Sequence, residues 1–157
     1  MAAPILIAYD GSGPARRAVR EAAELFGSRQ VLVATVWEEA LAYGSTAMPM
    51  AGADFQPAPV DVGLTREVAE ELETHARRVA EDGAEQARAA GLEAEAVPIA
   101  GDASAADAIV EMARKRGVAA IVIGSRGLTG LRARVEGSVS SGVVKHAACP
   151  VLVVHDD

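Results

Sequence analysis

The chain has 157 residues, of which 50% are hydrophobic and only 3% aromatic, and its formal net charge is −7 at pH 7. This length and composition predict a single domain, residues 1–157, with a core of aliphatic side chains. The acidic balance argues against a nucleic-acid partner, because neutralising a phosphate backbone requires clustered Lys and Arg.

The start of the chain, Met1 to Ile5, lacks the charged region and the long apolar stretch of a signal peptide. No apolar run approaches the length of a membrane span. We therefore expect a cytoplasmic protein without a membrane partner. Cys149 is the single cysteine, so no disulfide can form within the chain.

In chain order, an apolar run predicts a first strand at residues 5–9, and a helix then follows Gly13 and Pro14 and ends before Gly27. Its spacing predicts one inward stripe, made of Ala18, Val19, Ala22, Leu25 and Phe26. A second strand is expected at residues 31–37. Residues 40–63 are rich in Pro and Gly and read as a long surface loop.

The second half continues the alternation of helices and strands. Two helices are expected at residues 64–90 and 104–116, and the weak strand pattern between them contains Pro98, which favours a sheet edge. A final helix should begin near Gly137 and end before Pro150. The remaining strands are predicted at residues 93–99, 118–123 and 151–154.

This order predicts an α/β fold with a five-stranded parallel, doubly wound sheet and helices on both faces, as in Rossmann-like proteins. The common strand order for such a chain is 3-2-1-4-5. Ligands of these folds bind beyond the carboxyl ends of the strands, where the order switches between strands 1 and 4. Here those ends are residues 10–13 and 124–127.

Glycines at the end of the fourth strand have the spacing of a phosphate-binding segment. Gly124 and Gly127 are followed, after nine residues, by Gly137 and Ser138 at the start of the last helix. Glycine lets backbone N–H groups approach a phosphate closely, and a helix N-terminus favours an anion. The alternative is that these glycines only turn the chain and that Ser138 only caps the helix.

Other phosphate-binding loops are excluded. The P-loop motif needs a lysine after its second glycine, and neither Lys115 nor Lys145 has that context. The segment Gly11-Ser12-Gly13 has Arg16 where a dinucleotide fingerprint has its third glycine.

Together these segments resemble the universal stress protein family. The resemblance rests on residues 7–12 (IAYDGS), on the glycine spacing from Gly124 to Ser138, and on residues 148–154 (ACPVLVV). It covers the chain apart from residues 40–63, and it implies an adenine nucleotide alpha hydrolase-like fold. In members with this glycine spacing it also implies ATP binding, together with Mg²⁺ or Mn²⁺.

Carried over by position, the resemblance implies that Ala8 and Val36 contact adenine and that Asp10 approaches the phosphates or their metal ion. The phosphates and ribose would lie among Gly124, Gly127, Gly137, Ser138, Val139 and Ser140, and Tyr9, Ile123 and Arg126 would complete the site. Glu136 departs from the apolar residue that the family often has there. Asp10 has an alternative role, because an Asp before Gly-Ser often forms an Asx turn.

The resulting hypothesis is an ATP-binding stress-response or regulatory protein with at most slow ATP hydrolysis. The resemblance implies a homodimer through the C-terminal strand, and the apolar edge at residues 151–154 agrees with this. Two alternatives remain: a nucleotide-independent interaction module on the same fold, and a slow enzyme that hydrolyses ATP or transfers its phosphoryl group.

Overall fold

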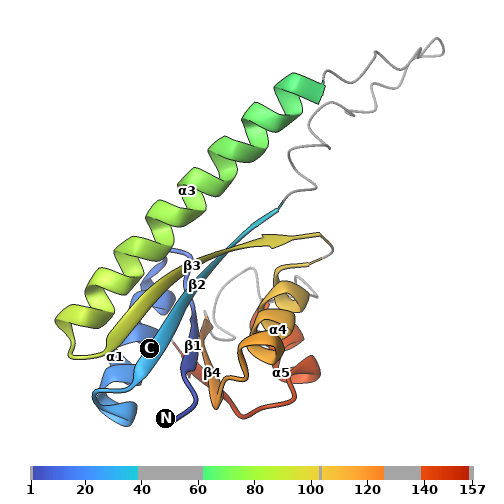
Figure 1. Ribbon diagram of the computed structural model, residues 1–157. Coiled ribbons are helices and arrows are strands. Elements are labelled where there is room, and N and C mark those ends of the chain that lie inside the picture. Colours follow the sequence, from blue (N-terminus) through green and yellow to red (C-terminus); the bar gives the residue numbers. More distant parts are fainter. Residues whose placement is uncertain (1, 39–61, 103, 126–138, 156–157) are drawn as a thin grey trace.

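A computed structural model describes residues 2–38, 62–102, 104–125 and 139–155 (Figure 1). Five strands in these ranges form one parallel sheet with the order β3-β2-β1-β4-β5. The α/β class and the predicted strand order are confirmed, including the edge position of the strand that contains Pro98. The strands are β1 (Ile5–Ala8), β2 (Gln30–Glu38), β3 (Glu93–Gly101), β4 (Ala120–Ser125) and β5 (Val151–His155).

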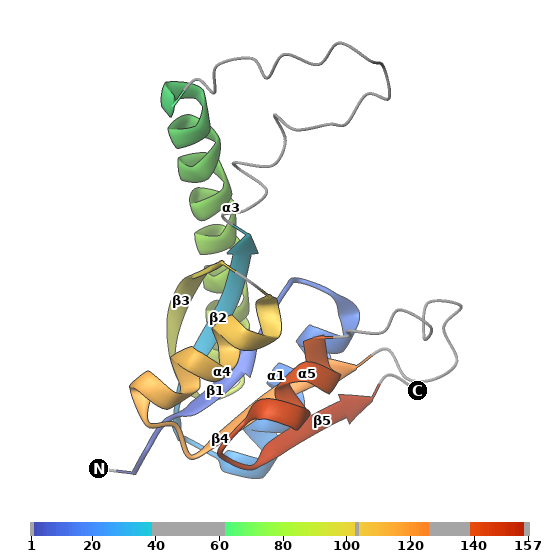
Figure 2. The same cartoon turned by 90° about the vertical axis from the view of Figure 1, so that its right-hand side faces the viewer.

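The described helices form two layers, one on each face of the sheet (Figures 1 and 2). They are α1 (Gly13–Phe26), α3 (Val62–Ala89), α4 (Ala105–Arg116) and α5 (Val139–His146). Ser12 caps α1, because its hydroxyl oxygen accepts the N–H of Ala15. Ser104 caps α4, because its hydroxyl oxygen accepts the N–H of Asp107. Gly117, in the left-handed region, ends α4.

The core divides between the two faces because neighbouring residues of a strand point to opposite sides. Ile5 and Ile7 of β1 belong to the cluster under α1 and α3, whereas Leu6 and Ala8 belong to the cluster under α4 and α5. The central strands are therefore apolar at successive positions, as expected for a parallel sheet that is covered on both faces.

Strands β2 and β3 continue beyond the end of β1. β1 stops at Ala8, whereas β2 stays paired with β3 as far as Glu38 and Gly101. Helix α3 runs along this extension and past it (Figure 1). Its 28 residues span about 42 Å at 1.5 Å per residue, more than the roughly 30 Å of a nine-residue strand.

Several predicted boundaries were wrong. β4 begins at Ala120 rather than at Val118, because the N–H of Val118 instead bonds to the carbonyl of Ala113 at the end of α4. Residues 62 and 63, predicted as loop, are helical. Helix α5 ends at His146, before Pro150 as predicted. The remainder of the predicted loop, residues 40–61, lies outside the described residues.

One residue of the predicted α1 stripe does not face the core. Ala18, Val19 and Ala22 are buried as expected, but Leu25 is 61% exposed. Phe26 packs against the core cluster instead, so it is the inward residue of the last turn. No described helix combines the length and apolar character needed to cross a membrane.

Candidate nucleotide-binding site

A cleft opens at the carboxyl ends of β1 and β4, where the strand order switches direction. Six elements contribute to it, because residues 34–36 of β2 and the first turns of α1, α4 and α5 meet there as well. Its lining residues are Ala8, Tyr9, Asp10, Ser12, Ala15, Ala34, Val36, Ala105, Ile109, Ile123, Gly124 and Val139.

The floor of the cleft is apolar and built from small side chains. Ala8 of β1 and Ala34 of β2 are buried neighbours in the sheet, and Ile123 of β4 flanks Ala8 on its other side. Ile109 faces them from α4 and is 3% exposed. Alanines on the two inner strands leave room above the sheet, so a flat apolar group can lie between the strands and α4.

The polar side of the cleft is formed by the residues that come directly after β1 in the chain. Asp10 is exposed, and its Oδ1 accepts the N–H of Ser12 over 2.9 Å. This bond makes an Asx turn, so the turn-forming role of Asp10 is present in the structure. Gly11 between them has φ +79°, a conformation that favours glycine. The carboxylate is therefore held by the turn at the mouth of the cleft.

Gly124 lies against the first turn of α1. A Cβ on this glycine would lie 2.5 Å from both the C and O atoms of Pro14. Such a distance is far below van der Waals contact, so β4 and α1 can approach this closely only because residue 124 has no side chain. The close packing brings the end of β4 next to the Asp10 turn.

Tyr9 contributes only its main chain to the cleft, because its side chain lies on the opposite face of the sheet. The ring belongs to the core cluster under α1 and α3 and is 3% exposed. Its hydroxyl donates to Asp82 Oδ2 on α3 over 2.6 Å. Burial, followed by this carboxylate, raises the pKa of Tyr9 above its ordinary value of 10.0.

The described part of the chain contains no group of three or more His, Cys, Asp or Glu side chains that could hold a metal ion. Among the described residues that line the cleft, Asp10 is the one carboxylate. A hard divalent ion at this position would therefore take most of its oxygen ligands from a bound nucleotide and from water, which is ordinary for Mg²⁺.

Comparisons with known proteins identify the family. The model of the universal stress protein family matches residues 1–155. The chain belongs to the universal stress proteins. It is 31% identical over 152 residues to universal stress protein YxiE of Bacillus subtilis, covering 96% of this chain and 97% of that protein.

Solved structures extend the likeness to the fold. The structure of hypothetical protein MJ0577 superposes with a TM-score of 0.72 at 23% identity, covering 100% of this chain and 98% of the other. The universal stress protein of Archaeoglobus fulgidus in complex with dAMP gives a TM-score of 0.53 at 26% identity, with 96% of each chain covered. At least one structural relative of this universal stress protein therefore binds an adenine nucleotide.

The structure brings together seven of the residues that the sequence predicted for the site. Gly124 and Val139 lie on either side of residues 126–138 in the chain, and both line the cleft. The other five at the cleft are Ala8, Tyr9, Asp10, Val36 and Ile123. Ser140 follows Val139 on α5 and is buried. The predicted residues Arg126, Gly127, Gly137 and Ser138 lie outside the described residues.

Sequence reasoning missed the contribution of α4. Ala105 and Ile109 line the cleft from the first turns of this helix, together with Ala15 of α1 and Ala34 of β2. Small apolar residues carry no chemical signal, and on a helix they read as core positions. Ser12 was missed as well, although a serine two residues after Asp10 is a signal for both the turn and the helix cap.

Proposed function

We propose that this chain binds ATP, with Mg²⁺ or Mn²⁺, in the cleft between β1 and β4. One observation carries the proposal: Gly124 and Val139, which flank the glycine-spaced segment, line the same cleft as Asp10. The described residues that flank the segment predicted to hold phosphates therefore lie at the place where a doubly wound sheet binds its ligand.

The apolar floor fits a nucleobase. Ala8, Val36 and Ile123 present aliphatic groups from three strands, and Ile109 does so from α4. A planar base would replace water against these side chains, which is favourable in proportion to the apolar area covered. The complex of the Archaeoglobus fulgidus relative with dAMP supports an adenine base in particular.

The phosphates would extend toward the polar side of the cleft. Helix α5 begins at Val139, so its first N–H groups lie where an anion is favoured. Gly127, Gly137, Ser138 and Ser140 are proposed to add backbone and hydroxyl donors, and Arg126 to add positive charge. The metal ion would neutralise part of the phosphate charge, and the Asp10 carboxylate fits as one of its oxygen ligands.

Calorimetric titration of the purified protein with ATP and Mg²⁺ tests the proposal. Gly127→Val and Gly137→Val each place side-chain atoms where the phosphates should approach the backbone, and each should abolish measurable binding and the ATP-induced rise in melting temperature. Ala89→Val is the matched control, because it adds a Val side chain at an exposed position at the end of α3.

The same experiment separates the alternatives. Wild-type protein that binds no adenine nucleotide would make the chain a nucleotide-independent interaction module. Retention of full ATP affinity in both glycine variants would show that the assignment of the phosphate segment is wrong. ATP turnover near 1 per second or above would make the chain an enzyme rather than a binding protein.

We also propose that the chain forms a homodimer through β5. This strand is the last in the sheet order, so one side of its backbone has no partner strand among the described residues. Its apolar side chains at Val151, Leu152 and Val153 are only partly buried. Pairing of two such edges about a two-fold axis would give the outward backbone N–H and C=O groups of both strands hydrogen-bond partners.

A further inference from the structure

Three elements meet at the hydroxyl of Tyr9, the residue immediately before Asp10. The hydroxyl donates to Asp82 Oδ2 over 2.6 Å and accepts from Gln86 Nε2 over 2.8 Å. Gln86 also donates to Asp82 Oδ2 over 2.9 Å, so the three groups close a ring of hydrogen bonds between β1 and α3. The guanidinium of Arg16 on α1 lies beside the same hydroxyl.

The aromatic ring of Tyr9 is held by close packing, in addition to the hydrogen bonds of its hydroxyl. It packs directly on the backbone of α3 at Gly83, where a Cβ would lie 2.7 Å from the ring atom Cδ1. Val33 of β2 packs against the same glycine, since a Cβ on Gly83 would also lie 2.8 Å from Val33 Cγ1. The ring is therefore closely packed against α3, and a side chain at residue 83 would displace it.

The main chain of Tyr9 is held by β2 at the point where β1 leaves the sheet. Its N–H donates to the carbonyl of Ala34 over 2.8 Å. Its own carbonyl accepts the hydroxyl of Thr35 over 2.8 Å, and Thr35 is buried. Beyond Tyr9 the chain passes to Asp10 and its turn, and the turn also lies beside α3, because a Cβ on Gly11 would lie 3.8 Å from Val79 Cγ1.

We propose that Tyr9 is a positioning residue for nucleotide binding: anchored by Asp82 and Gln86 of α3, it fixes the end of β1 and so sets where Asp10 and its turn stand in the cleft. This inference rests on the proposed function and deepens it. The side chain of Tyr9 packs on α3 and only its main chain reaches the cleft, so the side chain acts on the ligand through the residues that follow it.

Tyr9→Phe is the direct test, because it keeps the ring packed on Gly83 and removes only the hydroxyl. The first measurement is hydrogen exchange of the Ser12 amide in protein without nucleotide, since this N–H bonds to Asp10 Oδ1. We expect exchange to become about tenfold faster, and the dissociation constant for ATP to rise about tenfold, as for the loss of one partly buried hydrogen bond to a charged group.

Val31→Ala is the matched control. Val31 is buried in the same core cluster as Tyr9 but sits at the opposite, amino end of β2, beside Ile5. The Val31→Ala variant should lower the free energy of unfolding. ATP affinity and hydrogen exchange of the Ser12 amide should stay unchanged, because neither depends on global unfolding. A purely structural role for the tyrosine hydroxyl predicts instead that both variants behave alike.

A double-mutant cycle with Asp82→Ala tests the route of the effect. If Tyr9 acts through Asp82, the double variant should bind ATP no more weakly than Tyr9→Phe alone. Additive losses would overturn the anchoring role of Asp82, and wild-type exchange of the Ser12 amide in Tyr9→Phe would overturn the whole inference. Absence of ATP binding by the wild type would refute the proposed function, and the exchange measurement would still decide the role of Tyr9.

Discussion

The carboxylate of Asp10 combines a turn bond with a position at the mouth of the cleft. Its Oδ1 accepts the Ser12 N–H, and an asparagine oxygen can accept that bond equally well. Asp10→Asn should therefore keep the turn and remove only the charge. We expect the variant to lose most of the Mg²⁺-dependent gain in ATP affinity while its affinity in EDTA stays close to that of the wild type. An unchanged Mg²⁺-dependent gain in the variant would leave Asp10 with the turn-forming role alone.

The buried phenol of Tyr9 makes stability depend on pH in the alkaline range. Its pKa is raised by burial and by Asp82, although Arg16 and Gln86 act in the opposite direction. Folding therefore favours the protonated phenol, so its contribution is complete below about pH 10 and is lost as pH rises through the higher folded-state pKa.

Urea unfolding of the wild type and of Tyr9→Phe from pH 8 to pH 11 measures this contribution. All other titrating groups are common to the two proteins and cancel in the difference. The free energy of unfolding of the wild type should fall relative to that of Tyr9→Phe above about pH 10. Parallel curves across the range would contradict the raised pKa.

At the scale of elements, the sequence predicted the fold because its local signals agree with one another. Gly27 and Gly117 end α1 and α4, Ser12 caps α1, and Pro98 lies in the edge strand β3. The apolar runs are long enough to identify each strand but do not define its ends. Those ends depend on contacts distant in sequence, such as the bond from the Ala119 N–H to the carbonyl of Pro4.

The candidate site was predictable only where residues carry recognisable chemistry or spacing. Asp10 and Gly124 were found in this way, whereas Ala105 and Ile109 were not, because apolar helix residues at a cleft look the same as those in a core. The packing of Gly124 on Pro14 was equally invisible, since it depends on how two distant elements meet. It gives this glycine a structural role whether or not a phosphate approaches it.

Gly124→Ala tests the contact between β4 and α1. The added Cβ would meet backbone atoms of Pro14 rather than a flexible side chain, so the helix must shift. We expect a loss of about 1–3 kcal/mol in the free energy of unfolding, measured by chemical denaturation. Gly13→Ala is the control, since its Cβ would meet nothing within 4 Å, and it should be close to neutral. A neutral Gly124→Ala would mean that α1 is not held against β4 as tightly as the structure indicates.

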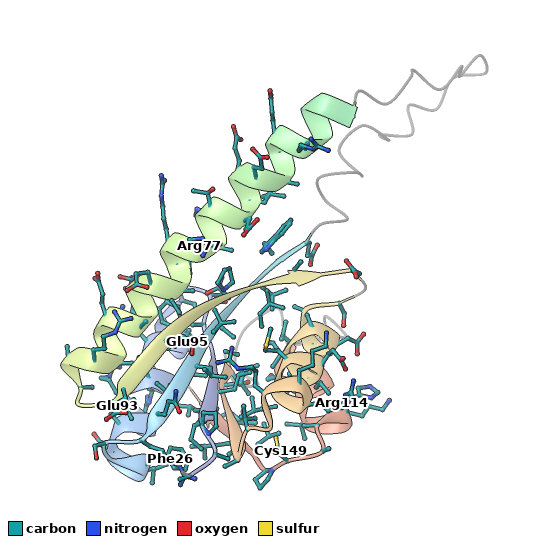
Figure 3. The ribbon with its side chains drawn as sticks, viewed as in Figure 1. Phe26, Arg77, Glu93, Glu95, Arg114 and Cys149 are labelled. Carbon is teal, nitrogen blue, oxygen red and sulfur yellow. The ribbon has the colours of Figure 1, made fainter. Side chains whose placement is uncertain are left out.

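At the scale of the whole molecule, exposed charges lie on the outer sides of the helix layers. Arg77 on α3 and Arg114 on α4 project into solvent (Figure 3). They pair with Glu73 and Glu111 over 2.8 Å, and exposed pairs of this kind contribute only a few tenths of a kcal/mol each. By contrast, β5 carries no charge between Val151 and Val154. An edge strand of this composition is poorly protected against pairing with another strand.

Alternate residues of β5 direct their backbone N–H and C=O groups toward β4 and toward the open edge of the sheet. The carbonyl of Pro150 accepts the N–H of Ile121, so residues 150, 152 and 154 direct their backbone groups toward β4. Because these directions alternate along a strand, Val151 and Val153 direct theirs to the open side. Two copies of β5 could pair through these outward groups without disturbing either sheet.

Val151→Pro therefore removes an outward N–H at the start of β5 and leaves the bonds to β4 intact. We expect wild-type protein to sediment as a dimer at micromolar concentration and Val151→Pro to sediment as a folded monomer with an unchanged circular dichroism spectrum. Leu152→Pro is the contrasting variant: it removes an N–H that faces β4 and should destabilise the fold itself. Sedimentation of the wild type as a monomer, both with and without ATP, would rule out pairing through β5.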